Sequence, residues 1–263
     1  MSNKPNQVTK VKEPLVRVTK RDVIPTWQKW AVRLIAILLS LVVVTIFVFS
    51  LTGIGPGETF GLMWEGVFSN MYYRKGTIFF TAKLLCIAVA LAPAFKMKFW
   101  NIGGEGQVLM GGLAAAACMI CLADKLPNAL LIVCMIIASI AAGAIWGFIP
   151  AFFKTKWNTN ETLSTLMMNY IATQLVAFFT IVWEVPKGSG KIGIINQDSK
   201  LGWLPQIFGS KYLLSIIVAV IITIFMYIYL KYSKQGYEIT VVGESENTAK
   251  YVGIKVGKVI IRT

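Results

Sequence analysis

The chain has 263 residues, of which 56% are hydrophobic and only 14% are charged. With a mean hydropathy of +0.65, it is too apolar for a soluble globular domain, in which about a quarter of the residues are charged. Its formal net charge of +14 would suit a nucleic-acid partner, but no basic module with interleaved aromatic residues accompanies it. The composition indicates an integral membrane protein.

Residues 1–29 are rich in Lys, Thr, Val and Pro, a composition typical of a disordered segment. We predict a basic cytoplasmic tail there. The first apolar stretch, 34–51, follows this tail and carries no charge, and it is long enough to cross the hydrocarbon core with its flanks. A stretch so long and so far from the N-terminus predicts a retained membrane span rather than a cleaved signal peptide.

Five more apolar stretches follow in the chain. They lie at about 78–95, 105–123, 129–153, 161–183 and 212–230. The sequence therefore predicts an all-α, polytopic membrane protein with about six transmembrane helices. We place the transmembrane domain at 30–232 and a cytoplasmic segment at 233–263. Between the first two spans, 53–76 has apolar residues at helical spacing, which favours either a short helix on the outer surface or an ordinary packed loop.

The basic residues are distributed unevenly between the two sides of the membrane. If the N-terminus lies inside, the inner segments carry 18 Lys and Arg and the outer segments carry 7. Because cytoplasmic loops hold the excess of positive charge, we predict a cytoplasmic N-terminus. The net charge then follows from topology, and no nucleic-acid partner is predicted.

Between the second and third spans, residues 99–107 combine three glycines with Asn101, Glu105 and Gln107. The segment can be a plain cytoplasmic turn, in which Glu105 is favoured by the dipole of the following helix. It can also be a broken or re-entrant segment within the membrane. Polar groups are costly in a bilayer and usually mark a pathway or a bound polar solute.

The fourth span carries a stripe of small residues. Ser139, Gly143, Gly147 and Ala151 recur every four residues. Small side chains on one helix face let another membrane helix approach closely. This stripe predicts helix packing and does not identify a function.

The fifth span carries a stripe of polar residues. Thr162, Thr165, Asn169, Thr173 and Thr180 stay within a sector of about 80° on one face, at 100° per residue. Polar groups on one face of a membrane helix contact protein or water rather than lipid. The stripe can make hydrogen bonds between helices, or it can line a route for a polyhydroxylated solute.

Catalytic and metal-binding patterns are missing from the sequence. The chain has no His, and its four cysteines all lie in apolar stretches, so no metal site and no cofactor are predicted. It also lacks a nucleophile elbow and paired carboxylates on one face, so no enzyme is predicted. Gly188–Lys191 lacks the first glycine and the hydroxyl residue of a phosphate-binding loop, and we expect no ATP hydrolysis by this chain.

Three blocks of sequence resemble the membrane permease subunits of bacterial ABC importers for nucleosides and simple sugars, the branched-chain amino acid/ribose permease-like family. The blocks are 99–107, 160–170 and 243–254, and the likeness runs from about Ile78 to Ile254. In the last block Gly243, Ala249, Tyr251, Gly253 and Ile254 fit the family pattern. Thr240 and Ser245 depart from it, since the family commonly has Arg and Asn there.

The resemblance implies a multi-pass subunit of the bacterial plasma membrane that translocates a nucleoside or a simple sugar. It implies three partners, namely a separate ATP-binding subunit, a second permease subunit and an extracytoplasmic solute-binding lipoprotein, which the outer loop 184–211 would dock. The residues expected to line the route are Asn101, Glu105, Gln107, Asn160, Glu161, Thr165, Asn169 and Thr173. The family continues beyond Thr263 with further spans, so we expect the chain to be truncated at its C-terminus.

The same resemblance implies a coupling segment over 244–254. A short helix that begins near Glu246 and ends at Gly253 would dock in a groove of the ATP-binding subunit, with Tyr251 and Ile254 as apolar contacts. The alternative is an ion-coupled secondary transporter of a small polar solute. That reading needs an intramembrane carboxylate, for which only Glu105 and Glu161 qualify. A membrane enzyme or a scaffold would need a catalytic constellation that the sequence does not show.

Overall fold

The computed structural model describes residues 25–210 and 212–263. Of the predicted tail 1–29, residues 1–24 lie outside the described residues. Residues 25–29 are described, and Thr26 begins the first helix. The described residues form ten helices and one isolated β-bridge. The helices are α1 (Thr26–Thr52), α2 (Pro56–Phe68), α3 (Met71–Lys96), α4 (Gly104–Leu122), α5 (Asn128–Trp157), α6 (Glu161–Val182), α7 (Leu213–Tyr232), α8 (Lys234–Glu244), α9 (Glu246–Tyr251) and α10 (Val256–Arg262).

Six of these helices, α1 and α3 to α7, are long and apolar enough to cross a membrane. This confirms the predicted all-α fold with six spans. The chain divides into two compact units, one that ends at Asn70 and one that covers Met71–Thr263. In the first unit α1 packs against α2. Part of the 53–76 segment is therefore helical, which agrees with the first of its two predicted alternatives. Helix α2 starts with Pro56 and has Glu58 in its first turn, both of which favour a helix N-terminus.

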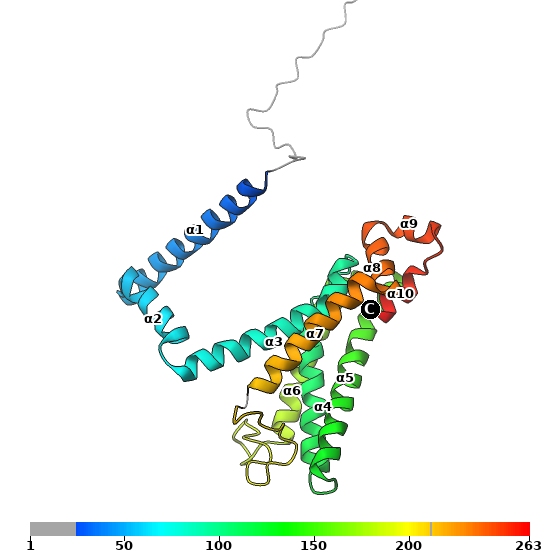
Figure 1. The fold of residues 1–263 in the computed structure, drawn as a ribbon. Helices are drawn as coiled ribbons and strands as arrows, with labels where there is room; N and C mark the ends of the chain where they lie inside the picture. Colours follow the sequence, from blue (N-terminus) through cyan, green and yellow to red (C-terminus); the bar gives the residue numbers. More distant parts are fainter. Residues whose placement is uncertain (1–24, 211) are drawn as a thin grey trace, which may run out of the picture. The chain divides into compact units, whose positions relative to one another are not determined.

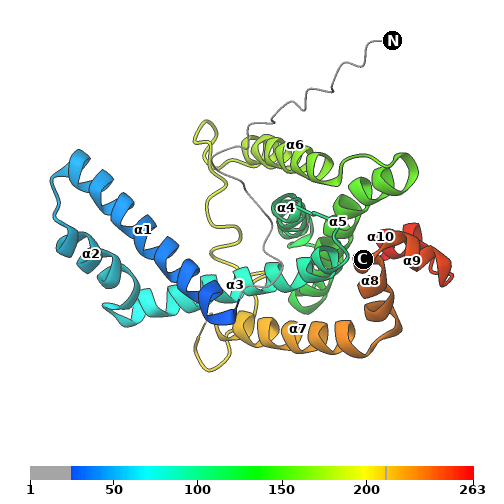
Figure 2. The ribbon, with the colours of Figure 1, turned by 90° about the horizontal axis from the view of Figure 1, so that it is seen from above.

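In the second unit α4 stands in the middle, with α5 and α6 packed against it (Figure 2). Helix α3 runs beside α7 (Figure 1), and α7 leads into the short helices α8 to α10. The chain turns from α5 to α6 within three residues. Asn158 ends α5 in the left-handed conformation, which Asn tolerates better than most residues. The Asn160 side chain then accepts a hydrogen bond from the Leu163 amide as the N-cap of α6.

The predicted stripe of small residues packs against α4. The Ser139 hydroxyl donates to the Gly111 carbonyl oxygen at 2.9 Å. A Cβ atom on Gly111 would lie 3.3 Å from the Ser139 carbonyl oxygen, and one on Gly147 would lie 2.8 Å from the Gln107 Nε2 atom. Small residues on both helices therefore allow this close contact, as the spacing predicts.

Buried apolar side chains gather at one end of the second unit. This cluster, here named the α8–α10 core, consists of Ala94, Met97, Phe99, Ala151, Ile239, Val242, Ala249, Val256, Val259 and Ile260. It joins the end of α3, the end of α5 and the three short helices. The spans themselves expose most of their large apolar side chains, as expected of helices whose solvent is lipid.

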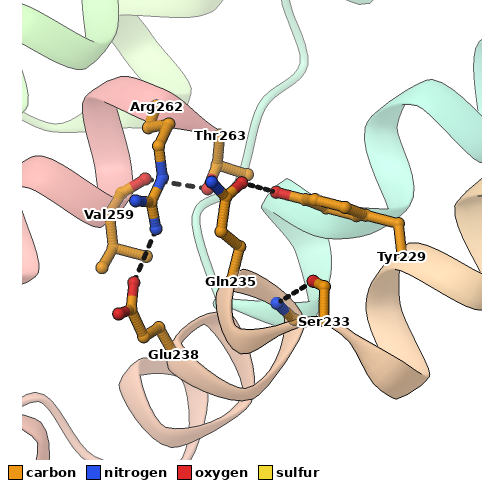
Figure 3. Close-up of polar contacts among 8 residues, drawn as sticks. Tyr229, Ser233, Gln235, Glu238, Val259, Arg262 and Thr263 are labelled. Atoms are coloured by element: carbon orange, nitrogen blue, oxygen red, sulfur yellow. Dashed lines mark hydrogen bonds and ion pairs between the residues drawn. The ribbon is translucent and has the colours of Figure 1, made fainter.

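Polar contacts fix α8 between α7 and α10 (Figure 3). The Ser233 hydroxyl caps α8 by accepting from the Gly236 amide at 2.9 Å, and the Tyr229 hydroxyl donates to Gln235 at 2.7 Å. Arg262 on α10 donates to Glu238 on α8 at 2.6 Å. The three short helices therefore form one packed segment at the end of α7.

Candidate functional site

The connection between α3 and α4 contains the motif that stood out in the sequence. Helix α3 ends at Lys96 and α4 begins at Gly104. Phe99 is buried in the α8–α10 core. The Asn101 side chain accepts a hydrogen bond from the Gly103 amide at 2.9 Å, which supplies a partner at the start of α4. The Phe99 side chain thus anchors the connection in the core, and the Asn101 carboxamide orders the residues next to α4.

Two residues of the polar stripe on α6 hold this connection. The Ile102 amide donates to the Thr165 hydroxyl at 3.2 Å, and that hydroxyl donates to the Glu161 carbonyl oxygen at 2.8 Å. Asn169 uses both atoms of its carboxamide, accepting from the Gly106 amide at 2.9 Å and donating to the Ile102 carbonyl oxygen at 3.0 Å. Thr165 is 0% exposed and Asn169 is 7% exposed. Their polar atoms are therefore bonded inside the protein.

Gly106 lies where α4, α5 and α6 meet. A Cβ atom there would lie 2.8 Å from the Asn169 Oδ1 atom and 3.0 Å from the Trp146 Nε1 atom. The Trp146 indole also donates to the Met168 carbonyl oxygen at 3.3 Å, which ties α5 to α6. Trp146 was not predicted from the sequence, because an aromatic residue in an apolar span adds no periodic polar signal.

The N-terminus of α4 is set back from the nearby ends of α5 and α6, which lie at Trp157 and Glu161. Gln107 lies against Gly147, and α5 continues for ten more residues to Trp157, which is about 15 Å at 1.5 Å per residue. On the other side, α6 begins eight residues before Asn169, which is about 12 Å. The connection therefore runs back into the bundle before α4 starts. The re-entrant interpretation of 99–107 and the plain cytoplasmic turn both stay predictions.

Two cavities lie along the face of α4 that carries Gln107. The first, of about 280 Å³, lies between α3, α4, α5 and α10 and is lined by both Asn101 and Gln107. The second, of about 560 Å³, is more open and apolar, and Gln107 and Ser139 are its polar residues. Ala90, Leu91 and Gln107 line both cavities. The second volume lies within the range of small-molecule sites, which is about 300–1,000 Å³, and the first lies just below its lower limit.

The short helix α9 lies where the sequence predicts it. Ser245 caps its start by accepting from the Thr248 amide at 3.2 Å. At its end Gly253 has a φ of 81°, and the amides of Gly253 and Ile254 donate to the carbonyls of Lys250 and Ala249. This is a Schellman ending, which requires the left-handed conformation that glycine adopts freely. The predicted start near Glu246 and end at Gly253 are confirmed.

Comparisons with known proteins decide the family. The profile of the family described as the branched-chain amino acid transport system, permease component, matches residues 73–263. The chain belongs to this family. This confirms the resemblance found in the sequence, and it identifies the chain with a transport component rather than an enzyme.

Three curated relatives of this permease-family chain are named for small polar solutes. A guanosine ABC transporter permease of Bacillus subtilis (strain 168) is 32% identical over 233 residues, which cover 88% of this chain and 66% of the relative. A glucose ABC transporter permease of Haloferax volcanii is 24% identical over 250 residues, 91% of this chain and 65% of the relative. A nucleoside ABC transporter permease of Lactococcus lactis subsp. cremoris is 27% identical over 186 residues, 68% of this chain and 51% of the relative.

The chain thus spans between half and two thirds of the length of these relatives. No solved structure matches it significantly. Among residues 25–210 and 212–263, no three metal-ligating side chains lie close enough together to hold an ion.

The expected route residues of the permease-family chain fall into separate groups. Asn101 and Gln107 line the first cavity. Glu105 is exposed in the first turn of α4, and Thr173 is exposed on α6 with its hydroxyl bonded to the Asn169 carbonyl oxygen. Asn160 caps α6, and Glu161 forms an ion pair with Lys154 at 2.9 Å. Thr165 and Asn169 contact the connection, and none of these last four lines either large cavity.

The expected coupling residues also differ in their surroundings. Tyr251 is 92% exposed, whereas Ala249 is fully buried. Ile254 is half-buried and packs against the α8–α10 core, so its side chain is less free than that of Tyr251 to contact a partner. Gly243 is buried against the carbonyl group of Lys96 at the end of α3. The coupling role of all these residues stays a prediction.

The long loop after α6 is ordered by its own hydrogen bonds. The Glu184 carboxylate accepts from the amides of Gly188 at 2.7 Å and Gly190 at 2.8 Å, and these bonds lower the pKa of Glu184 below its ordinary value. Further along, Asn196 donates to the Met119 carbonyl oxygen at 3.2 Å, and the Gly202 amide donates to Asn128 at 2.8 Å. The loop is therefore fixed to the last turns of α4 and to the first residue of α5.

Proposed function

We propose that the chain is the permease subunit of an ATP-driven importer and forms part of the route for a nucleoside, with a simple sugar as the second choice. The family membership supports a transport role, and two of the three relatives above are named for guanosine or nucleosides. We place the subunit in the bacterial plasma membrane with its N-terminus in the cytoplasm, because that orientation puts most of the basic residues inside.

The observation that carries this proposal is the recessed start of α4 beside the first cavity. Asn101 and Gln107 line that cavity, and their side-chain amides can both donate and accept hydrogen bonds. Few such contacts to a polar solute bind it weakly enough for release on the other side. Glu105 adds a negative charge at the start of α4, which the helix dipole favours.

Thr165 and Asn169 act in this scheme as positioning residues rather than as solute ligands. Their side chains bond to Ile102 and Gly106, and so they fix where Asn101 and Gln107 stand. Asn160 and Glu161 order the turn from α5 to α6 in the same indirect way. Thr173, which is exposed on α6, is the stripe residue that remains available to a solute or to a neighbouring helix.

The ATP-binding subunit docks at α9. Tyr251 offers an exposed aromatic ring on a short helix whose two ends are both capped, and a rigid aromatic anchor is typical of an interface. Movement of α9 would reach the α8–α10 core, in which Phe99 is the first residue of the motif 99–107. In this way the work of the ATP-binding subunit is transmitted to the connection that carries Asn101.

Two further partners complete the importer. The ordered loop between α6 and α7 docks the solute-binding lipoprotein, since loops held by a rigid scaffold commonly carry recognition. A second permease subunit packs beside this one and closes the route. These assignments follow the family and stand as proposals.

The test is purification of the tagged chain from its own cells, followed by uptake of labelled guanosine into proteoliposomes. We expect the ATP-binding subunit to co-purify, and uptake to need ATP. Tyr251→Asp should release the ATP-binding subunit, whereas Tyr237→Asp, which changes another exposed tyrosine on α8, should retain it. If Tyr251→Asp keeps the subunit and transports normally, the coupling assignment is wrong.

The ion-coupled alternative has a separate signature. Uptake driven by an ion gradient persists without ATP and collapses when an ionophore is added. The ATP-driven importer behaves in the opposite way in both experiments. Glu105 and Glu161 are the carboxylates to neutralise if the ion-gradient result is obtained, and Glu161 already has Lys154 as its partner.

A further inference from the structure

A tight turn before α7 carries the most exposed large hydrophobic side chain of the described residues. Ile207 and Ser210 form an antiparallel bridge, with the Ser210 amide donating to the Ile207 carbonyl oxygen at 3.0 Å. Phe208 and Gly209 form the tip and have φ angles of 50° and 68°. Phe208 is 96% exposed. A left-handed conformation is unfavourable for a bulky residue, and such a tip usually holds Asn-Gly or Gly-Gly.

The turn lies close to the membrane because α7 has no length to spare. Its 20 residues span about 30 Å at 1.5 Å per residue, which equals the thickness of the hydrocarbon core. Leu213, the first residue of α7, must therefore stand at the edge of the hydrocarbon. Phe208 precedes it by five residues, and the bridge between Ile207 and Ser210 closes the turn, so the tip lies within a short reach of the start of α7.

Contacts with a second span hold the turn at this level. The ring of Tyr212 packs on that of Phe79 in α3, with centroids 4.9 Å apart. The Tyr212 amide donates to the Ser210 hydroxyl at 3.3 Å. Two spans thus fix the base of the turn, and the tip cannot move far along the membrane normal without breaking these contacts.

We propose that Phe208 inserts into the headgroup layer of the membrane and anchors the loop between α6 and α7. Aromatic side chains prefer this interface, where an apolar ring meets acyl chains and polar backbone meets water. The loop 184–211 holds four lysines against two acidic residues, which favours anionic headgroups. The anchor requires only that α3 and α7 cross the membrane, and it does not depend on which solute is transported.

A spin label at position 208 tests the anchor. The four cysteines are free and are first replaced by alanine; Phe208→Cys is then labelled in the chain reconstituted in bilayers of phosphatidylethanolamine and phosphatidylglycerol. We expect apolar oxygen to reach the label better than a water-soluble nickel complex. Ser199→Cys, at an exposed polar position of the same loop, is the matched control and should favour nickel.

Two outcomes overturn the proposal. A label at position 208 that favours nickel as strongly as the Ser199→Cys label does shows a tip in water. A label that favours nickel in bilayers but becomes shielded only when the solute-binding lipoprotein is added shows a protein-docking tip instead.

Discussion

At the scale of single residues, α4 and α6 meet through matched spacings. Ile102 pairs with Thr165, and Gly106 pairs with Asn169, each pair 63 positions apart in the chain. Both partners advance by four residues, which is about one helical turn. Backbone groups of Ile102 and Gly106 are thus satisfied by two side chains from a neighbouring helix. In a membrane, where water does not replace such bonds, this arrangement is a structural requirement.

Gly106→Ala tests how tightly this point is packed. The added methyl group would overlap the Asn169 side chain and the Trp146 indole, and such overpacking costs about 1–3 kcal/mol. We expect a lower unfolding temperature in detergent and reduced uptake. Gly112→Ala in the same helix is the control, because nothing lies within 4 Å of its Cβ position.

Alanine also has the higher helix propensity, by up to about 1 kcal/mol. Gly112→Ala should therefore leave stability unchanged or raise it. Equal unfolding temperatures for the two variants would show that the three-helix contact is loose and that Gly106 serves another purpose.

The sequence predicts which residues of the site matter but not what each one touches. Periodicity places Thr165 and Asn169 on one polar face of a helix, and two roles for that face remain open from spacing alone. Only the position of α4 shows that their polar atoms are used inside the protein. Trp146 is absent from the predicted site for the same reason, since its role comes from helices that meet in space.

At the scale of the elements, the apolar stretches predict the spans better than they predict the helix ends. The predicted span at 78–95 lies within α3, which begins seven residues earlier at Met71 and includes Arg74 and Lys75. Helix α5 likewise continues past its apolar stretch to Trp157. Hydropathy reports the part of a helix that crosses the hydrocarbon, whereas backbone hydrogen bonds continue into the interface.

The short helices depend on caps that the sequence does show. Ser245 and Gly253 bracket α9, and both residue types are strong signals for helix ends. Burial of Ala249 in the α8–α10 core was not predictable, because that core is assembled from five helices. The buried face of α9 then leaves Tyr251 on the outer side.

Gly243→Ala tests whether α8 must lie directly on the end of α3. A methyl group there would clash with the Lys96 carbonyl oxygen, a backbone atom that cannot rotate away. We expect α8 to separate from α3 at a cost of about 1–3 kcal/mol, which is roughly a 5- to 150-fold change in local opening. Limited trypsin cleavage at Lys250 and Lys255 should accelerate accordingly.

Gly257→Ala on α10 is the matched control for this experiment. Its Cβ position meets only the Thr155 side chain at an ordinary distance of 3.7 Å. Cleavage should then proceed at the rate of the unchanged chain. Similar rates for both variants would mean that the α8–α10 core does not depend on the contact with α3, and the proposed route from α9 to the motif would lose its first link.

At the scale of the whole molecule, the apolar surface and the basic residues both describe a protein placed across a bilayer. Large apolar side chains cover the outside of the spans, and only lipid or further membrane helices can cover so much apolar surface. Lys and Arg gather in the segments predicted to be cytoplasmic. We predict that the α8–α10 core lies on that side and that the loop 184–210, at the other end of α7, lies on the opposite side of the membrane.

Cysteine labelling tests this orientation directly. In the cysteine-free chain, Ser189→Cys introduces an exposed thiol before α7 and Tyr251→Cys introduces one after it. A maleimide that cannot cross membranes should label Ser189→Cys in intact cells and Tyr251→Cys only in inverted vesicles. The reverse pattern would place the N-terminus outside and would show that the distribution of Lys and Arg does not predict the orientation of this chain. Labelling of both thiols from one side would show that α7 does not cross the membrane, which would also remove the physical basis for an anchor at Phe208.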